Sequence, residues 1–451
     1  MRSLLDKSLG KLFGLLARAR LAGAVAWLLG HTLRRVGPRK PHARYTILML
    51  PRVVFYEDVL ASFGDHEDFA VVEPPQSMIK ALANAFLPRN VDTNNYLSSS
   101  SETAKCKEEY RSFLKKTWRH LMQSRPIHAV VTGNFAYYAE RELAAALEEL
   151  GTPFVAMHKE NLKSPGRIAF SRTIYRDRRG RFGGRRILVY NEREAQLQID
   201  SGVIDPGRVT VSGMPRLDRI HQWRRQMHNR STPDARPCVL FFSFTGSAVL
   251  PRIPRRADAG FDQNSETLSD DLRTLSWSQL AEKTHQAIRR LAEENPDIDV
   301  FVKSKIRMRE RREMHRMLRI ADGLPRNMNI VEGGDPLDLI TGADVVCGFN
   351  STALLESLAA GKPVVIPRFA EAVRDDMQPY IVNLEDAVDY AESPDMLVAR
   401  LREHALEKRR NSSELDQSRQ RVLQSWTGNP DGFSGKRVRD AVRAEIVASE
   451  G

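Results

Sequence analysis

Cysteine is scarce in this chain of 451 residues, and its distribution excludes two common kinds of stabilising site. The three cysteines are an odd number and lie far apart, at Cys106, Cys238 and Cys347. They do not show the close spacing of zinc ligands, and they cannot form the disulfide framework of a small secreted protein. The sequence therefore predicts reduced thiols in a cytoplasmic protein.

The N-terminal region lacks an apolar run long enough to cross a membrane. Its mostly apolar stretch, Leu21 to Leu33, is shorter than the ~20 residues that a spanning helix needs. A secretory signal is not favoured either, since no small-residue cleavage site follows this stretch.

Acidic residues are nearly absent from residues 1–44, where ten Lys and Arg side chains face a single acid, Asp6. Leucines such as Leu5, Leu9 and Leu12 predict a basic amphipathic helix in this segment. Two hypotheses follow. The helix lies on the anionic inner face of the plasma membrane, or it packs on the body of the protein. Nucleic acid is not a predicted partner, because neither zinc spacing nor an RNA-binding signature accompanies the charge.

The length exceeds what one hydrophobic core usually serves, so we expect two domains. The basic N-terminal segment, residues 1–44, precedes a first α/β domain predicted over residues 45–230. A second α/β domain is predicted over residues 231–410, and a helical tail over residues 411–451. Between Arg167 and Arg186, eight arginines interrupted by glycines predict an exposed basic loop.

The stretch from Ala343 to Pro367 predicts a strand, a turn, a helix and a second strand. The apolar run Val345–Cys347 suits a strand buried on both faces, and either Asn350 or Ser351 can cap the helix that follows. Gly361 suits the end of that helix. Such units build parallel sheets.

Ligand sites form at the carboxyl ends of parallel strands, where helix N-termini present free N–H groups. Asn350, Ser351 and Thr352 lie at such a place, and Glu356 follows about one helical turn later. They could hold a diphosphate and a ribose. The alternative is that the hydroxyls only cap the helix and that Glu356 is a solvated carboxylate.

The residues Gly348–Thr352, Glu356 and Gly361–Pro363 resemble the nucleotide-sugar half-site of GT-B glycosyltransferases and of UDP-N-acetylglucosamine 2-epimerase. More narrowly, they look like bacterial capsule and surface-carbohydrate biosynthesis proteins. The resemblance implies two Rossmann-like domains facing across a cleft, an N-terminal acceptor domain and a C-terminal nucleotide-sugar domain. It also implies that Ser351 and Thr352 contact the donor's diphosphate, that Glu356 binds its ribose, and that no metal or other cofactor is needed.

Two strand ends in the predicted first domain carry polar residues. Ile127–Val131 leads into Thr132–Asn134, and Pro153–Met157 leads into His158 and Glu160. These two side chains are the nearby groups able to accept a proton from an attacking hydroxyl, so either is a candidate catalytic base. The alternative is a structural hydrogen bond in a loop.

Three further residues of the predicted second domain are candidates for binding the donor. Gly246 and Ser247 follow the strand Val239–Phe242, and Lys303 follows the strand Val300–Val302, where its charge would face the diphosphate. The turn Gly213–Asp218 resembles the Gly-x-Pro-Arg-x-Asp turn that the family places between its domains.

The predicted function is transfer of a sugar from a nucleotide-sugar donor to a surface polysaccharide or lipid-linked acceptor. The alternatives are a nucleotide-sugar 2-epimerase, a CDP-glycerol-type glycerophosphotransferase and a non-catalytic polysaccharide assembly protein. The Lys-x-His-Pro pattern of glycerophosphotransferases is absent after Val302, which weakens that alternative.

Overall fold

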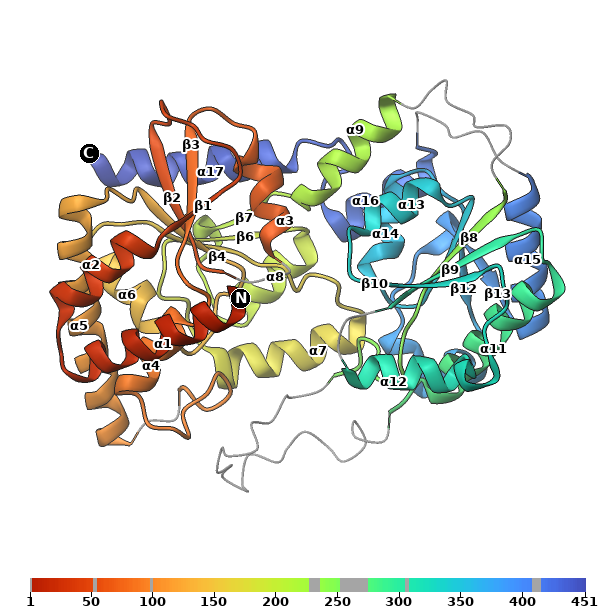
Figure 1. Ribbon diagram of the computed structural model, residues 1–451, viewed down its shortest axis with the longest axis horizontal. Coiled ribbons are helices and arrows are strands. Elements are labelled where there is room, and N and C mark those ends of the chain that lie inside the picture. Colours follow the sequence, from red (N-terminus) through yellow and green to blue (C-terminus); the bar gives the residue numbers. More distant parts are fainter. Residues whose placement is uncertain are drawn as a thin grey trace.

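The computed structural model describes residues 2–51, 55–97, 100–226, 236–251, 275–304, 308–407 and 415–451. These residues form two α/β units, each with a sheet flanked by helices (Figure 1). The predicted boundary between residues 230 and 231 lies outside the described residues.

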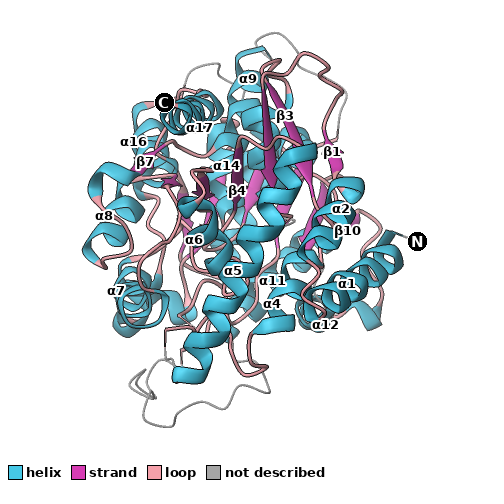
Figure 2. Cartoon of the chain, turned by 90° about the vertical axis from the view of Figure 1, so that its left-hand side faces the viewer, coloured by secondary structure: helices cyan, strands magenta, loops and turns pink. Residues whose placement is uncertain are grey.

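The first sheet has seven strands, and six of them are parallel. In spatial order they are β1 (Arg34–Val36), β3 (Phe69–Glu73), β2 (Tyr45–Met49), β4 (Ala129–Thr132), β5 (Phe154–Met157), β6 (Arg186–Val189) and β7 (Val209–Val211). The edge strand β1 is antiparallel to β3. The flanking helices are α3 (Tyr56–Val59), α4 (Met78–Phe86), α5 (Ser101–Ser124), α6 (Arg141–Glu149), α7 (Pro165–Ile174) and α8 (Glu192–Asp200). Figure 2 shows these helices around the strands.

The second sheet has six strands, all parallel. Their order is β10 (Met328–Glu332), β9 (Asp299–Ser304), β8 (Cys238–Phe242), β11 (Val345–Cys347), β12 (Val364–Pro367) and β13 (Asp389–Ala391). This is the 3-2-1-4-5-6 order of a Rossmann fold. The flanking helices are α11 (Ser278–Glu294), α12 (Met308–Met317), α13 (Pro336–Gly342), α14 (Thr352–Ala359), α15 (Pro394–Glu407) and α16 (Gln417–Thr427). The predicted fold class, two Rossmann-like domains, is confirmed.

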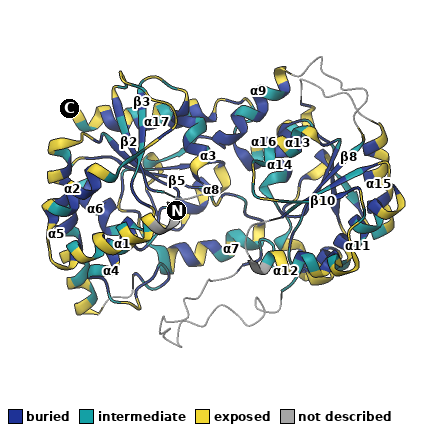
Figure 3. Cartoon of the chain, in the orientation of Figure 1, coloured by how far each residue is buried: buried dark blue, intermediate teal, exposed yellow. Residues whose placement is uncertain are grey.

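Hydrophobic cores fill both sides of the first sheet and surround the second sheet. All the residues of β4, β5, β11 and β12 are buried, as expected for parallel strands covered on both faces. Figure 3 shows this burial along the strands of both domains. The apolar runs therefore form the strands that carry the candidate site.

The basic N-terminal segment forms two helices, α1 (Arg2–Arg18) and α2 (Ala22–Thr32), followed by β1. The predicted amphipathic helix is confirmed by α1, and it packs on the protein: α1 lies on α4, α2 lies on α5, and Phe13 and Val25 are fully buried. Asp6 accepts a hydrogen bond from Arg34. None of the described helices is both long and apolar enough to cross a membrane.

The chain crosses between the domains twice. The first crossing runs through Gly213 into α9 (Asp218–Gln226), and the second runs from α16 to α17 (Ser434–Glu450), which lies along the first domain (Figure 1). Asp218 joins the two crossings, because its carboxylate accepts hydrogen bonds from the backbone N–H groups of Ser434 (3.0 Å) and Gly435 (2.7 Å) at the start of α17. The predicted inter-domain turn therefore also caps the last helix.

The predicted basic loop between Arg167 and Arg186 is wrong. Pro165 begins α7, which continues into a turn of π-helix, and many of the arginines are paired. Arg167 donates to the carbonyl oxygen of Leu250 in the second domain (3.0 Å), and Arg185 pairs with Glu148 (3.1 Å). These arginines make contacts with distant parts of the chain. A count of charges along the sequence cannot show such partners.

Two buried histidines predict that acid destabilises the protein. Burial, together with nearby arginines, lowers the pKa of His221 to about 3, and burial lowers that of His285 to about 4. In the unfolded chain both titrate near pH ~6.5, so below that pH the unfolded state binds more protons than the folded state. The stability that these two histidines contribute should therefore be fully present above pH ~6.5 and be lost progressively as the pH drops towards ~4, with a slope of about one bound proton per histidine.

Urea unfolding measured at a series of pH values checks this expectation. The variant His285→Gln should show a shallower loss of stability between pH ~6.5 and ~4 than the wild type, because one titrating group is removed. Equal slopes for the two proteins would contradict the assignment.

Candidate functional site

The N-terminal end of α14, which we call the mouth of α14, lies at the carboxyl end of β11. Strand β11 is next to β8 at the centre of the second sheet. Of the two caps left open by the sequence, Ser351 is the one observed: its hydroxyl accepts a hydrogen bond from the N–H of Ala353 (3.3 Å). Ser351 and Thr352 are both half-buried, so they are within reach of solvent. A Cβ atom added at Gly348 would lie only 3.3 Å from the Cβ of Phe242 on β8, so a side chain would not fit well there. The backbone here is held close to the neighbouring strand.

Asn350 is used by the fold. Its φ angle is +48°, its Nδ2 donates to the carbonyl oxygen of Tyr380 (2.9 Å), and its Oδ1 accepts from the N–H of Val382 (2.9 Å). Both ends of the amide are therefore occupied, and the structure does not leave the Asn350 side chain free for a diphosphate. It holds the loop after β12 against the mouth of α14.

Glu356 is buried, and its charged partner comes from the inter-domain turn. Its Oε1 accepts from Nε of Arg216 at 3.2 Å, and Nη1 of Arg216 lies 3.3 Å from Asp58 of the first domain. Asp58 also accepts from the hydroxyl of Tyr190 (2.6 Å). The alternative of a solvated carboxylate is excluded by this burial, since only 8% of the Glu356 side chain is exposed. We call Asp58, Tyr190, Arg216 and Glu356 the inter-domain charge cluster.

Burial and charge pairing shift the pKa values of this cluster in opposite directions, and burial dominates for Glu356 but not for Arg216. It raises the pKa of Glu356, and Arg216 opposes that rise. For Arg216, burial alone would lower the pKa, but Tyr190, Asp58 and Glu356 together raise it above the usual arginine value. The guanidinium is therefore charged, and it compensates two carboxylates from different domains.

The loop after β8 forms a second part of the site. A Cβ at Gly246 would lie 2.6 Å from the Ser278 hydroxyl, so the glycine allows this loop to pack on the start of α11. Ser247 lines a pocket of about 220 Å³ together with Ser243, Thr245 and Ser304. His285 fixes Ser243: its Nδ1 donates to a carbonyl oxygen, so its Nε2 accepts from the Ser243 hydroxyl (2.8 Å).

Lys303 ends β9 but does not point freely into this pocket. Its amine donates to the carbonyl oxygen of Gly333 in the loop after β10, and burial lowers its pKa. The neighbouring Lys305, part of the same basic strand end, lies outside the described residues.

The two candidate bases of the first domain have different surroundings. His158 is buried, with 3% of its side chain exposed, and its Nε2 lies 3.1 Å from Oε1 of Glu194 and 3.3 Å from the hydroxyl of Tyr175. Glu194 also pairs with Lys163. His158 therefore has the structural environment that the sequence left open as the alternative to a catalytic role. Glu160, two residues on, keeps 64% of its side chain exposed.

A pocket of about 400 Å³ lies between the domains at the carboxyl ends of β11 and β12. Its second-domain wall includes Phe349, Arg368 and Tyr390, and its first-domain wall includes Pro165 and Arg193. The guanidinium of Arg193 stacks on Trp426 (4.4 Å), and that of Arg368 lies over the ring of Tyr390 (5.4 Å). The sequence alone did not identify these walls, because their residues come from five separate segments of the chain. The one indication in the sequence was the segment after β12, which begins with Arg368.

No protein-family model matches this chain, and no curated protein matches it. Solved structures of similar shape include a putative UDP-N-acetylglucosamine 2-epimerase from Listeria monocytogenes, with 13% identity, coverage of 90% of this chain and 97% of that chain, and a TM-score of 0.49. They also include a glycosyltransferase from Rickettsia africae, with 13% identity, coverage of 89% and 99%, and a TM-score of 0.48. The fold assignment rests on the order of the strands in the two sheets.

Proposed function

We propose that this protein is an enzyme that binds a nucleotide-activated sugar between its two domains. The observation that carries the proposal is the pocket of about 400 Å³ at the carboxyl ends of β11 and β12, walled on its other side by the first domain. Parallel sheets bind ligands at this end of their strands, and the volume lies within the ~300–1,000 Å³ of small-molecule sites.

Phe349, just before the N-terminal end of α14, lines this pocket, and the donor would reach from it to three further parts of the second domain that do not line it. The diphosphate meets the N-terminal end of α14 at Ser351 and Thr352, where the helix dipole and unpaired N–H groups favour negative charge. The ribose hydroxyls donate to Glu356, and the loop at Gly246 and Ser247 closes over the phosphates from the other side. The positive charge of Lys303 stands at the neighbouring strand end.

Glu160 is the proposed catalytic base. It follows the carboxyl end of β5 and is exposed, whereas His158 is enclosed by Glu194 and Tyr175. In glycosyl transfer Glu160 would take the proton of an attacking hydroxyl on a polysaccharide or lipid-linked acceptor. The developing charge on the leaving nucleotide would be stabilised by the α14 N–H groups.

The second candidate function is 2-epimerisation of the sugar. The run from Gly361 to Arg368, which resembles the nucleotide-sugar epimerases, contains β12 and supplies Ile366, Pro367 and Arg368 to the wall of the pocket.

A panel of nucleotide sugars tested by thermal shift and by product analysis separates these functions. We expect at least one donor to raise the melting temperature, because a ligand held only by the folded form stabilises it. A new sugar formed without acceptor indicates an epimerase, and release of the free nucleotide only with acceptor indicates a transferase. No binding to any nucleotide would contradict the proposal and favour a non-catalytic assembly protein.

Replacing Glu160 with glutamine should lower turnover by roughly a hundredfold or more and leave donor affinity unchanged, because a general base contributes to the chemical step alone. Glu102→Gln, at an exposed position at the start of α5, is the matched control and should keep full turnover. Full activity of Glu160→Gln would remove this residue from the mechanism.

A further inference from the structure

Helix α1 presents three distinct faces. One face is buried against the first domain and includes Phe13 and Ala17, both fully buried. Gly10 lies on the same face, so close to α4 that a Cβ there would be 2.4 Å from the Ser77 hydroxyl. This face accounts for the packing of α1 on the protein. The two remaining faces are open to solvent.

The second face is apolar and exposed. Leu5, Leu12 and Leu15 are spaced seven and three residues apart, which places them on one side of a helix, and they are 57%, 42% and 61% exposed. Leu21 (50% exposed) and Trp27 (64% exposed) follow in the next turn and in α2. These five are a large share of the exposed large hydrophobic side chains among the described residues, and they fall within 23 consecutive positions. Such a concentration marks an interaction surface.

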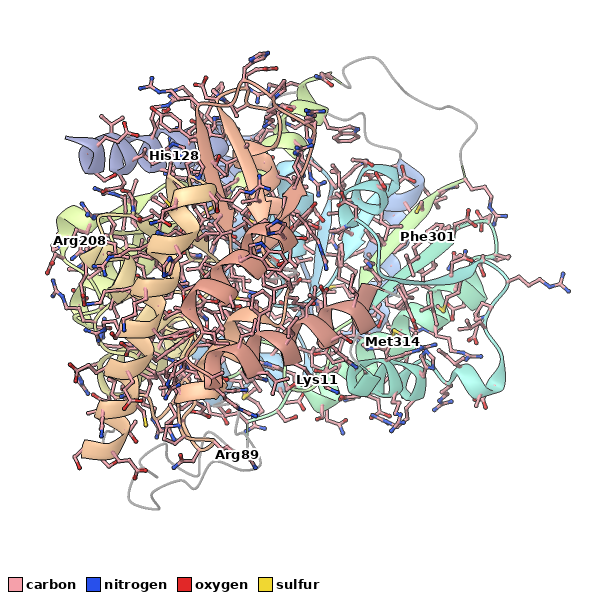
Figure 4. The ribbon with its side chains drawn as sticks, turned by 60° about the vertical axis from the view of Figure 1, so that its left-hand side comes forward. Lys11, Arg89, His128, Arg208, Phe301 and Met314 are labelled. Atoms are coloured by element: carbon pink, nitrogen blue, oxygen red, sulfur yellow. The ribbon has the colours of Figure 1, made fainter. Side chains whose placement is uncertain are left out.

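The third face is basic. Lys7, Lys11 and Arg18 are spaced four and seven residues apart, so they form a stripe that borders the apolar one, and all three are exposed. Figure 4 shows Lys11 on the outer side of α1. Within the part of the chain that the structure describes, none of the three has a carboxylate at ion-pair distance. By contrast, Arg20 pairs with Glu109 at 3.1 Å and Arg34 pairs with Asp6.

We propose that this surface of α1, formed by Leu5, Leu12 and Leu15 beside Lys7, Lys11 and Arg18, docks the protein on an anionic lipid bilayer. A helix with an apolar stripe beside a cationic stripe lies in the membrane interface, with its leucines among the acyl chains and its cations at the headgroups. The docking does not depend on the identity of the reaction in the cleft.

A second copy of the chain is a poorer occupant for this surface. In a symmetric dimer the same patch meets itself, so the stripe of Lys7, Lys11 and Arg18 would face another stripe of the same charge. Like charges across an interface oppose association, whereas anionic lipids complement them. α1 lies across the first domain with its N-terminal end directed towards the second domain (Figure 1), so a docked bilayer would run beside the body of the protein.

Vesicle flotation of the full chain tests the proposal. The vesicles are pure phosphatidylcholine, or phosphatidylcholine with about 30% phosphatidylglycerol to supply the anionic surface. We expect binding to the anionic vesicles, little binding to the neutral ones, and a marked loss at high salt, where the Debye length is short. Replacing Lys7, Lys11 and Arg18 with glutamine should weaken binding roughly a hundredfold, and replacing Leu12 and Leu15 with glutamine should weaken it at least tenfold.

The matched control replaces exposed apolar residues elsewhere, Leu406 in α15 and Val447 in α17, with glutamine, and it should bind as the wild type does. Melting temperatures confirm that each variant folds. Absence of binding by the folded wild type, or equal binding by wild type and α1 variants, would overturn the proposal. A dimer in solution that the Leu12 and Leu15 changes dissociate would likewise overturn it and assign the surface to a second copy.

Discussion

The variant Glu356→Gln should lose the stabilisation that a uridine- or cytidine-type donor gives to the wild type. If the ribose hydroxyls donate to this carboxylate, replacing its charge with an amide removes charged hydrogen bonds worth about 1.5–3 kcal/mol each, which weakens binding roughly 10- to 100-fold. Isothermal calorimetry with the free nucleotide measures the loss directly. Glutamine keeps the shape of the side chain, so packing around α14 should be preserved.

The control must separate ribose binding from the ion pair that Glu356 makes across the domains. Arg216→Gln breaks the same pair, 3.2 Å long, from the other side and leaves the carboxylate in place. We expect Arg216→Gln to bind nucleotide far better than Glu356→Gln does. Equal affinities in the two variants would show that Glu356 acts only through the inter-domain charge cluster.

Removing Arg216 altogether should destabilise the protein by about 3–5 kcal/mol, because Arg216→Ala leaves Asp58 and Glu356 buried without their counter-charge. The loss should appear as a lower melting temperature and, since the cluster joins the domains, as weaker coupling between the unfolding of the two.

Arg219→Ala is the matched control for this experiment. Arg219, in α9 just after the first crossing, pairs with Asp335 at 2.7 Å, but both side chains are about one-third exposed, and such pairs contribute only about 0–1 kcal/mol. The contrary result is an equal loss in the free energy of unfolding for Arg216→Ala and Arg219→Ala. It would show that the buried charge cluster does not stabilise the contact between the domains.

Continuous apolar runs predicted most of the sheet. β2, β4, β5, β6, β8, β9, β11 and β12 all lie where such runs occur, because buried parallel strands need apolar side chains on both faces. Strand β3 was not predicted, although Phe69–Glu73 is largely apolar. The edge strands β1 and β13 were not predicted either, because their sequences, Arg34–Val36 and Asp389–Ala391, are short and polar, and only pairing with a neighbouring strand makes them strands. Helix α7 was missed because its arginines resemble a solvated segment until their partners are known.

The site was predictable where it depends on local sequence. The strand, turn and helix around Ser351 follow from capping and periodicity over about 25 residues. The partners of its charged residues were not predictable, since Arg216 lies 140 residues before Glu356 in sequence. The burial of His158 has the same origin, because Glu194, on a different helix, lies beside its ring.

The two crossings between the domains touch each other, and this contact limits how the molecule can open. Gly213 and Gly428 both have positive φ angles, +84° and +81°, and a Cβ on Gly428 would lie 3.3 Å from Cα of Gly213. Such a Cβ would also lie 1.7 Å from the carbonyl oxygen of Tyr190, so no larger residue fits there. Because both covalent connections between the domains meet at these two glycines, any opening would be a rotation of one domain about this point. The parts of the two domains farthest from Gly213 and Gly428 would then move the most.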